Sequence, residues 1–450
     1  MSAPTDIEHR SQLNETHNPE RRSWVASANA RGTDFPLQNL PFGVFTTQGR
    51  DARGGVAIGD YILDLREALT AKLFSGSVSD VARAAAAADL SSFVSLGPSA
   101  ASALRARLFE MLCEGDEGSS ATRAKAERLL VPRPSATLLL PLTPRSFTDF
   151  CTSLHHIERM GRGRPPHPAW ARIPVAYNGR SSSVRESGYP VRRPCGQFAA
   201  AGEADAELRL RAEPNLDFEL ELGAWLCADS TLGEPMTLDA ADQSIFGYCL
   251  VNDWSARAIQ YFEMALGPFL GKSFLTTISP WIVSAEALLP FRARAPLRTP
   301  GQPAVPSHLQ SEHHAAFGGA EIELTASLQT SSMRRAGIAA RLLTRTNTEH
   351  LHWTFAQMIC HQTTAGGNLC SGDLVASGTV SGPSDQSRAC FAELNEGGRK
   401  ELELPGGEHR MWLGDGDEIV LRGRARRAGF VSIGFGECSG RVEPALCLGR

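Results

Sequence analysis

The sequence predicts an α+β protein that is rich in β-structure. Short apolar or alternating runs, separated by turns with Gly and Pro, recur in the second half of the chain, which is typical of strands in a large domain. These runs lie at 218–226, 245–251, 322–328, 374–377, 418–421 and 431–435. The segment 81–130 is instead rich in Ala, Leu, Arg and Glu, and Leu104, Leu108 and Met111 recur at helical spacing. Helices are therefore expected mainly in this earlier segment.

The organisation of the chain follows from shifts in composition. Residues 1–32 are polar and charged, so we expect a disordered extension. Residues 33–137 form a first domain that opens with β-structure, because two apolar runs flank Gly59 and Asp60, a connection suited to a hairpin turn. Its helical segment follows. Residues 138–450 form a second, larger domain, whose clearest helix is expected at 353–362.

Composition excludes several classes of function. A chain of 450 residues is long enough for two domains, and 42% hydrophobic with 21% charged residues is typical of a globular protein. A net charge of −4 gives no reason to expect nucleic acid as a partner. The N-terminus lacks the apolar core of a secretory signal, and no apolar run is long enough to cross a bilayer. We therefore expect a cytoplasmic protein with no membrane partner.

The segment Leu-Asp-Phe-Glu-Leu-Glu-Leu at 216–222 is the most informative in the chain. In a strand, Asp217, Glu219 and Glu221 would share one face. Neighbouring carboxylates would lie roughly 7 Å apart and repel by about 2–3 kcal/mol at an effective dielectric near 20. Asp253 follows another apolar run. Hard ions such as Ca²⁺ or Mg²⁺ prefer such oxygens, whereas zinc prefers Cys or His; a half-buried strand with a solvated acidic face is the alternative.

A second motif joins an acid to a histidine. Asp149 and His156 are seven residues apart, so both would approach one point if the segment were helical. Histidine has the pKa range of a general base near neutral pH. The alternatives are that Asp149 only caps a helix and that His156 is only packed or solvated.

Two further segments carry polar groups near Asp253. Asn252 is a candidate helix cap. Arg257 and Gln260 then fall at i and i+3 on one face of the helix, and this face either points toward a substrate near Asp253 or is exposed to solvent. The segment 267–273 superficially resembles a phosphate loop, but its glycines enclose three residues where that loop requires four, so no nucleotide site is indicated. Its Lys272 lies among apolar neighbours and is either an anion-stabilising group or a surface residue.

Taken together, the segments 34–45, 174–183, 252–260, 267–274 and 376–379 resemble, in order and in spacing, the fumarylacetoacetate hydrolase family. The resemblance runs from about Asp34 to the C-terminus. It implies a small SH3-like N-terminal barrel, a large C-terminal mixed β-roll catalytic domain, and a homodimer. It also implies metal-dependent hydrolysis of the C–C bond of 4-fumarylacetoacetate to fumarate and acetoacetate, the last step of tyrosine and phenylalanine catabolism.

The resemblance implies roles for single residues. The Ca²⁺ ligands would be Asp149, Glu219, Glu221 and Asp253, supported by Asp217, while Lys272, through its backbone, and Thr276 would help hold a further Mg²⁺. His156 would be the general base, Glu393 would orient it, and Arg257, Gln260 and Lys272 would stabilise the oxyanion. Tyr177, Gln260 and Thr379 would contact substrate. These residue types suit the reaction. Water needs a base to remove its proton, and its attack on a ketone builds an oxyanion that cationic and amide groups stabilise. A divalent ion would stabilise the enolate that leaves.

The sequence also departs from the family pattern. Cys151 and Met264 stand where the family usually carries tyrosines that touch substrate, and the shortened stretch after His156 leaves either Arg162 or Arg164 as the substrate-clamping arginine. Two alternatives therefore stay open: a hydrolase of another acylpyruvate or β-diketone, and a non-catalytic metal-binding paralogue.

Overall fold

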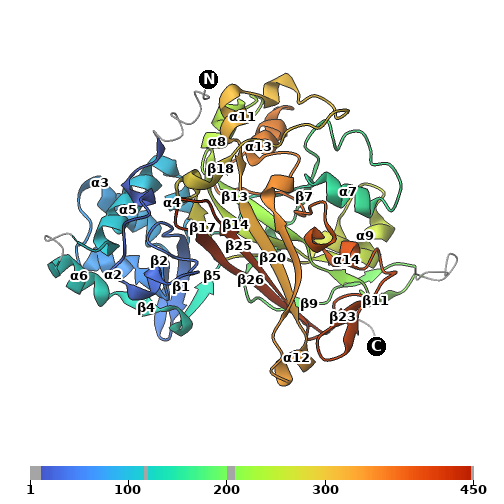
Figure 1. The fold of residues 1–450 in the computed structure, drawn as a ribbon, viewed down its shortest axis with the longest axis horizontal. Coiled ribbons are helices and arrows are strands. Elements are labelled where there is room, and N and C mark those ends of the chain that lie inside the picture. Colours follow the sequence, from blue (N-terminus) through green and yellow to red (C-terminus); the bar gives the residue numbers. More distant parts are fainter. Residues whose placement is uncertain (1–11, 116–119, 200–207, 447–450) are drawn as a thin grey trace.

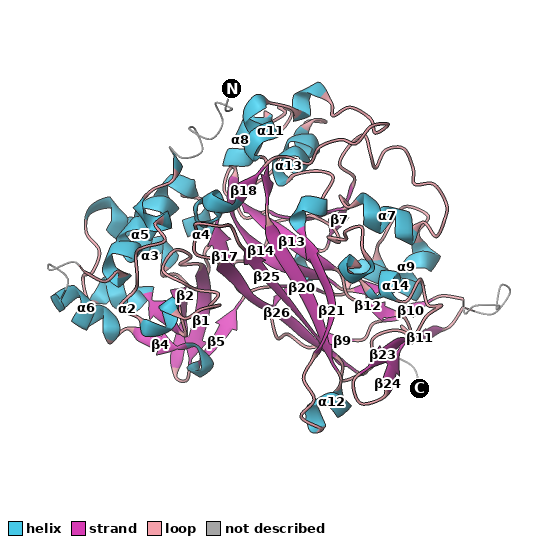
Figure 2. Ribbon diagram, viewed as in Figure 1, coloured by secondary structure: helices cyan, strands magenta, loops and turns pink. Residues whose placement is uncertain are grey.

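The computed structural model describes residues 12–115, 120–199 and 208–446. Figure 1 shows a helix-rich N-terminal lobe beside a larger lobe in which long strands cross the centre of the molecule. Helices cluster above and beside these strands, while the strands themselves fill the middle (Figure 2). The coarse prediction of a mixed α+β, sheet-rich protein is confirmed.

The N-terminal lobe combines strands with a group of helices. Its strands are β1 Phe42–Thr47, β2 Arg50–Ile58, β3 Tyr61–Asp64, β4 Leu130–Pro132 and β5 Ala136–Leu139. Its helices are α2 Leu65–Thr70, α3 Gly76–Ala85, α4 Ser91–Val94, α5 Gly97–Leu112 and α6 Ser120–Glu127. The helical segment expected at 81–130 is thus confirmed, and so is the hairpin, since Ile58 pairs with Tyr61 across Gly59. Gly59 has a φ of +54°, and a Cβ there would lie 2.3 Å from Ser27 Oγ, so only glycine fits.

The N-terminal strands do not close into a barrel within the described residues. They form the order β4-β3-β2-β1, β5 pairs with β1, and β1 also pairs with β17 (Trp281–Ser284) of the larger lobe. The SH3-like barrel is therefore not confirmed. Because β5 runs across the boundary expected between residues 137 and 138, strand pairing assigns residues 138 and 139 to the N-terminal strands.

The prediction of a disordered extension is wrong for the described residues 12–32. This segment forms the short 3₁₀ helices η1 Glu15–His17 and η2 Ala26–Asn29 and packs onto the folded chain. Arg105, which is fully buried, donates to the Thr16 carbonyl and to the Gln38 carbonyl, and the Asn14 amide donates to Glu286 at 2.7 Å. Residues 1–11 lie outside the described residues. Polar composition misled here because some polar residues of 12–32 are buried: Thr16, His17 and Ser23, of which Ser23 donates to the Leu112 carbonyl at 2.7 Å.

The His17 ring gives this docking a pH dependence. Its Nδ1 accepts from the Asn14 backbone N–H at 3.1 Å and its Nε2 contacts the Glu286 carbonyl at 2.9 Å, a pairing that only the neutral ring satisfies. Burial, with Arg105 nearby, lowers the pKa of His17 from 6.5. A lowered folded pKa means that this stabilisation is complete above 6.5 and is lost as pH falls through the folded pKa.

We therefore expect residues 14–29 to lose amide-exchange protection when pH falls from about 7.5 to about 5. Hydrogen exchange, corrected for the intrinsic pH dependence of amide exchange, measures this loss. The His17→Gln variant, which does not titrate in this range, is the control and should show a smaller change. Equal protection of the wild type at both pH values would contradict the expectation.

The larger lobe is built on two sheets. The first continues from β1 through β17, β14 (Ile245–Asp253), β13 (Leu220–Leu226), β22 (Leu374–Ala376), β6 (Phe147–Phe150) and β7 (Ala176–Gly179), with β16 (Thr276–Ile278) beside β14 and β8 (Val184–Glu186) beside β16. The second has the order β21 (Arg341–Asn347), β20 (Ile322–Gln329), β25 (Glu418–Ala425), β26 (Ile433–Glu443) and β9 (Val191–Arg192). Short pairs complete the strands: β10 Cys195–Gln197 with β11 Leu210–Ala212, β12 Leu216–Asp217 with β15 Ser255–Ala256, β18 Arg292–Ala293 with β19 Gly319–Ala320, and β23 Leu402–Leu404 with β24 Glu408–Arg410.

Strand β14 shows why the first sheet is rigid: every one of its residues is buried. Leu250 packs with Leu324 and Leu421 of the second sheet in one core cluster. Phe246 and Val251 belong instead to the cluster formed with the N-terminal helices. Because both faces of this strand are covered, its sequence is a nearly continuous apolar run. The strand ends at Asp253. It therefore holds that carboxylate on a fixed backbone.

The helices of this lobe lie around the sheets. They are α7 Leu154–Met160, α8 Leu238–Gln243, α9 Arg257–Glu263, α10 Leu270–Ser273, α11 Glu312–Phe317, α12 Ser331–Arg335, α13 Phe355–Thr363 and α14 Phe391–Leu394. The helix expected at 353–362 is confirmed as α13. Helices α7, α9 and α14 lie together at one side of the sheets (Figure 1). No helix in the described part of the chain is long and apolar enough to cross a membrane.

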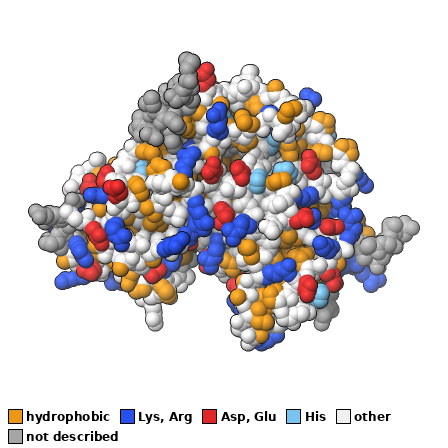
Figure 3. All heavy atoms as spheres, viewed as in Figure 1, with side chains coloured by type: hydrophobic (Ala, Val, Ile, Leu, Met, Phe, Trp, Pro, Cys, Tyr) orange, Lys and Arg blue, Asp and Glu red, His pale blue; other side chains and the backbone are white. Residues whose placement is uncertain are grey.

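The surface in Figure 3 carries both signs of charge. Lys and Arg side chains are interspersed with Asp and Glu, with a group of basic side chains near the middle of this face. This mixture agrees with the near-balanced net charge of the chain.

Candidate active site

Strand pairing brings the predicted acids to one place. Asp149, on β6, pairs with Ala376 of β22, which in turn pairs with Gly223 of β13. On the other side of β13, Glu221 pairs with Val251, two residues before Asp253. Adjacent strands therefore carry Asp149, Glu221 and Asp253 at neighbouring positions of one sheet.

The acidic segment 216–222 is not one continuous strand. Asp217 ends β12 and Leu220 begins β13, with Phe218 and Glu219 between the two strands. Asp217, Glu219 and Glu221 are all buried, with exposed fractions of 0%, 4% and 0%. The alternative of a solvated acidic face is therefore wrong, and the alternation instead places three carboxylates inside the protein.

Three carboxylates form a compact cluster. One ligand oxygen from each of Asp149, Glu221 and Asp253 lies within 4.8 Å of the others. Both carboxylate oxygens of Glu221 and Oδ1 of Asp149 have no hydrogen-bond partner among the described residues. Burial raises the pKa values of Asp149 and Glu221, and the nearby carboxylates raise them further. Buried, unpartnered carboxylate oxygens are costly unless a cation balances them, so this donor set fits a hard divalent ion.

Glu219, the fourth predicted ligand, is paired differently. It accepts from Arg257 at 2.7 Å and from Lys272 Nζ, and its Oε1 lies 3.9 Å from His156 Nε2. Burial would raise the pKa of Glu219, but Lys272 and Arg257 outweigh it and hold the pKa low. Glu219 is thus an ionised carboxylate held between cations, and three of the four predicted ligands meet without it.

Lys272 acts here through its side chain. The ammonium group contacts Glu219 and donates to Asp253 Oδ2 at 2.5 Å. Although burial would lower its pKa, Asp253 and Glu219 raise it, so the amine stays charged. The family resemblance implied a role for the Lys272 backbone near an ion, whereas the observed contacts are those of Nζ. Thr276, as predicted, lies beside the cluster, with its hydroxyl 3.4 Å from Asp253 Oδ1.

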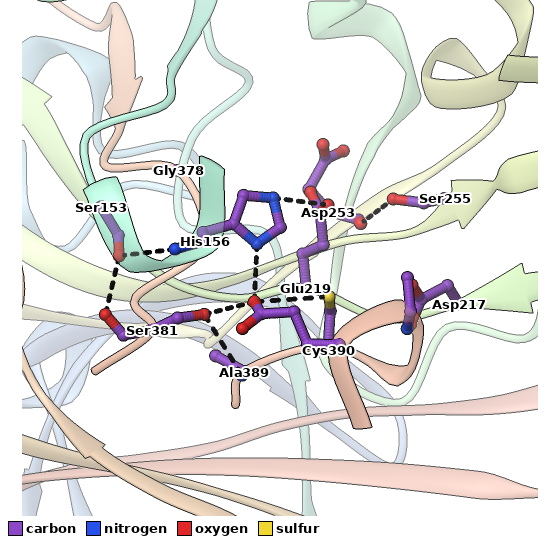
Figure 4. A network of polar contacts seen from close by, with 12 residues as sticks. Ser153, His156, Asp217, Glu219, Asp253, Ser255, Gly378, Ser381, Ala389 and Cys390 are labelled. Atoms are coloured by element: carbon purple, nitrogen blue, oxygen red, sulfur yellow. Dashed lines mark hydrogen bonds and ion pairs between the residues drawn. The ribbon is translucent and has the colours of Figure 1, made fainter. Parts of the chain in front are cut away.

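The predicted base and its partner are in contact. His156 Nδ1 lies 2.6 Å from Glu393 Oε1, and Glu393 also accepts from Ser381 Oγ and from Arg159 at 2.8 Å. Burial would raise the pKa of Glu393, but these hydrogen bonds hold it low. An ionised Glu393 fixes the proton on Nδ1 and leaves Nε2 as the acceptor. Figure 4 shows His156 close to Ser381, Cys390 and Glu219 in this network.

The backbone between Asp149 and His156 differs from the prediction. Asp149 belongs to strand β6, and only α7, which begins at Leu154, is helical. The two residues approach the same cavity through a strand, a short loop and a helix, not through two helical turns. Ser153 caps α7 by accepting from the His156 N–H at 3.2 Å. Sequence reasoning missed Arg159, which its i+3 position from His156 would have indicated.

Arg257 connects Asp217 and Glu219 of the acidic segment with Gln260 on helix α9. Its guanidinium donates to Asp217 at 2.9 Å, to Glu219 at 2.7 Å and to the Gln260 side-chain oxygen at 3.0 Å. The prediction that Arg257 and Gln260 share a helix face is confirmed. Asn252 does not cap this helix, because its side chain accepts instead from the Glu219 N–H at 3.1 Å.

Asp217 connects Arg257 to the helix of the predicted orienting carboxylate. Besides Arg257, it accepts from the backbone N–H groups of Phe391 at 2.6 Å and Ala392 at 3.0 Å. These residues begin α14, which carries Glu393. One buried carboxylate therefore holds both the guanidinium and the helix that supports His156.

We expect the Asp217→Asn variant to lower kcat/KM by roughly 10- to 100-fold, a usual range for a group that orients a catalytic residue. The amide loses the ion pair with Arg257 and one of the two acceptor positions needed at α14. The pH profile of kcat should also shift, because Glu393 would be held less firmly against His156. The exposed Asp385→Asn variant is the control, and an unchanged pH profile with unchanged kcat/KM would contradict the expectation.

A cavity of about 1130 Å³ opens over these groups. Among the predicted site residues, it is lined by Asp149, His156, Tyr177, Glu219, Glu221, Arg257, Gln260, Lys272 and Thr379. The Tyr177 hydroxyl donates to Asp253 at 2.8 Å. Of the two candidate arginines, Arg164 lines the cavity, whereas Arg162 stacks 5.5 Å from the Tyr261 ring centroid.

Comparison with known proteins agrees with this geometry. Residues 38–141 match the family model of the fumarylacetoacetase N-terminal domain, and residues 145–443 match that of the fumarylacetoacetate (FAA) hydrolase C-terminal domain. The chain belongs to the fumarylacetoacetate hydrolase family.

Relatives named fumarylacetoacetase align with nearly the whole length of this chain. A fumarylacetoacetase of Oryza sativa subsp. japonica is 39% identical over 94% of this chain and 98% of its own length. A fumarylacetoacetase of Caenorhabditis elegans is 41% identical over 92% of this chain and 98% of its own length. A solved fumarylacetoacetate hydrolase from the psychrophilic Exiguobacterium antarcticum is 17% identical, with a TM-score of 0.47, over 90% of this chain and 99% of that chain.

Two positions at which this member of the fumarylacetoacetate hydrolase family departs from the usual pattern face the cavity. Cys151 and Met264 both line it. Neither contacts the His156–Glu393 pair by a hydrogen bond, so the departures leave the base and the acid cluster intact. They change the walls against which a substrate would lie.

Proposed function

We propose that this protein hydrolyses the C–C bond of 4-fumarylacetoacetate to fumarate and acetoacetate, as the last step of tyrosine and phenylalanine catabolism. The observation that carries the proposal is the His156–Glu393 pair, at 2.6 Å, whose imidazole lines the same cavity as Asp149 and Glu221 of the acid cluster. A base beside a cation site is what the hydrolysis of a 1,3-diketone requires.

In this proposal His156 is the general base. Its Nε2 takes a proton from water, which then attacks the ketone carbon, while Glu393 stabilises the protonated ring through Nδ1–H. The C–C bond breaks, and its electron pair remains on the acetoacetate fragment as an enolate. His156 returns its proton to the enolate carbon, so the water supplies both the new carboxylate oxygen and the new C–H bond.

Cationic and amide side chains are positioned to stabilise the developing oxyanion. Lys272 and Gln260 line the cavity, and Arg257 holds the Gln260 side-chain oxygen, which leaves the Gln260 amide N–H groups available as donors. The charged state of Lys272 supports this role. Tyr177, Gln260 and Thr379 would contact substrate, and Arg164 is the better candidate to clamp its carboxylate because Arg162 is engaged with Tyr261.

We assign the acid cluster to a divalent cation, with Ca²⁺ at Asp149, Glu221 and Asp253 and with Glu219 as a fourth ligand. A further Mg²⁺ would lie near Asp253, Lys272 and Thr276. When bound, the cation would act as a Lewis acid toward the diketone oxygens and the enolate. The SH3-like barrel, the homodimer and the cytoplasmic location stay predictions.

Turnover of purified protein tests the proposed function. With Ca²⁺ or Mg²⁺ present, the ultraviolet absorbance of fumarylacetoacetate should disappear, and fumarate and acetoacetate should appear in equal amounts. Protein treated with a chelator is the control, and activity should return when the ion is added back. A folded, ion-loaded protein that leaves the substrate unchanged would reject the proposal.

The second candidate, a hydrolase of another acylpyruvate or β-diketone, rests on Cys151 and Met264 in the cavity wall. A substrate panel separates it from the first, because a smaller or more apolar diketone would then be preferred over fumarylacetoacetate. The non-catalytic alternative is less well supported, since the His156–Glu393 contact is retained.

A further inference from the structure

A cluster of softer ligand atoms lies near the acid cluster. Cys390, Glu393 and His156 each offer a ligand atom within 4.8 Å of the others, and all three residues are buried. Cys390 is a free cysteine whose sulfur lies 3.7 Å from Glu393 Oε1. Figure 4 shows this sulfur turned toward the network around His156. The proposed hydrolysis uses His156 and Glu393 but gives Cys390 no role.

Two short helices bring these ligand atoms together. Cys390 directly precedes α14, and Glu393 lies three residues further along on the same helix, whereas His156 lies on α7. Arg159 binds Glu393 Oε2 at 2.8 Å, which leaves Oε1 facing His156 Nδ1 at 2.6 Å. The sulfur, the carboxylate oxygen and the ring nitrogen therefore surround one small volume.

The types of ligand atom distinguish this cluster from the neighbouring carboxylates. A thiolate, an imidazole and one carboxylate suit Zn²⁺, whereas Asp149, Glu221 and Asp253 offer only oxygen. In a tetrahedral zinc site, ligand atoms about 2.0–2.3 Å from the ion are roughly 3.3–3.8 Å apart. The sulfur–oxygen distance of 3.7 Å already fits. The nitrogen–oxygen contact has to open by roughly 1 Å.

We propose that His156, Cys390 and Glu393 form an inhibitory zinc site. Zn²⁺ binds Nδ1, Sγ and Oε1, and water takes the fourth position. The thiolate and the carboxylate together balance the charge of the ion. The proton on the sulfur leaves to solvent, because a thiol bound to the ion is deprotonated. The proton on Nδ1 moves to Nε2.

The inhibition follows from this change of tautomer. Once Nε2 carries a proton, it is a donor and can no longer accept the proton of the attacking water. This loss of turnover rests on the proposed hydrolysis, in which His156 is the general base. The ion binding itself does not depend on that function.

Turnover in the presence of Zn²⁺ tests the inhibition. With Ca²⁺ saturating, added Zn²⁺ should abolish turnover of fumarylacetoacetate, and further Ca²⁺ should not restore it. The Cys390→Ser variant should need at least about 100-fold more Zn²⁺ for the same fractional loss, because losing a group that only supports a ligand already costs about 10- to 100-fold in affinity. Each protein is compared with its own rate without Zn²⁺. Cys151→Ser is the matched control: Cys151 lines the catalytic cavity but lies outside the cluster, so this variant should stay as sensitive as the wild type.

Cobalt detects the site without turnover. Co²⁺ accepts the same ligands as Zn²⁺, and a thiolate bound to it gives a charge-transfer absorption in the near ultraviolet that oxygen ligands do not give. We expect this absorption in the wild type and in Cys151→Ser, its loss in Cys390→Ser, and its displacement by Zn²⁺ at the concentrations that stop turnover. The wild-type and Cys151→Ser spectra do not depend on the folding of Cys390→Ser.

The outcomes separate this inference from the proposed function. Turnover that Zn²⁺ leaves unchanged, or inhibition that further Ca²⁺ relieves, would overturn the inhibitory site while the hydrolase proposal stands. A cobalt absorption that is absent from the wild type, persists in Cys390→Ser or disappears in Cys151→Ser would also overturn it. The expected cobalt absorption in a protein that does not hydrolyse fumarylacetoacetate would support the metal site and reject only the proposed function.

Discussion

Replacing His156 by Ala is expected to lower kcat by about 10²- to 10⁴-fold, the range that general acid–base catalysis contributes. The variant loses the Nε2 acceptor, and none of the described side chains around Glu393 replaces it: Arg159 is a charged donor and Ser381 is a hydroxyl already bonded to Glu393. Steady-state turnover of fumarylacetoacetate measures the loss. KM and ion affinity should change little, because the Asp149, Glu221 and Asp253 cluster does not depend on the imidazole.

The neighbouring histidine provides the control for this substitution. His155 does not line the cavity and faces the His350 ring, with the ring centroids 6.3 Å apart. The His155→Ala variant should therefore keep nearly the turnover of the wild type. The fold of the His156→Ala variant should survive, since Arg159 and Ser381 still compensate the buried Glu393 carboxylate. Full activity in a folded His156→Ala protein would remove His156 from the mechanism.

The sequence predicted the composition of the site better than the path of the backbone. The segment 216–222 identified three acids that are indeed buried, although its backbone is divided between β12 and β13. It did not reveal that Glu219 is paired with Arg257 and Lys272, since those residues come from helices α9 and α10, far along the chain. Long-range pairing of this kind leaves no local pattern.

The errors have a common physical cause. Seven-residue spacing between Asp149 and His156 is compatible with two helical turns, but pairing of β6 with β22 overrides it. Polar residues at 12–32 indicate disorder only if they remain solvated, and Arg105 and the Leu112 carbonyl instead provide buried partners. In both cases tertiary contacts outweighed a local signal. The hairpin at Gly59 was predictable because a tight turn with positive φ is specified locally.

Replacing Glu221 by Gln is expected to weaken Ca²⁺ or Mg²⁺ binding by about 100-fold, or about 2.8 kcal/mol. Both Glu221 carboxylate oxygens are buried, and neither has a hydrogen-bond partner among the described residues. A bound cation is therefore the partner that would balance the negative charge of Glu221. Isothermal titration calorimetry measures the affinity, and turnover should fall in parallel. The exposed Glu234→Gln variant is the control. Unaltered ion affinity in the Glu221→Gln protein would remove Glu221 from the ligand set.

The same substitution should act in the opposite direction when no ion is present. Burial and the nearby Asp149 raise the folded pKa of Glu221 above its ordinary value of 4.5. The stabilisation from the protonated form is therefore complete below about 4.5 and is lost as pH rises through the folded pKa. With chelator at neutral pH, the Glu221→Gln variant should thus unfold at a higher temperature than the wild type, whereas saturating Ca²⁺ should reverse the order. A Tm for the chelated variant that lies below the chelated wild type would show that Glu221 stabilises the fold without a cation.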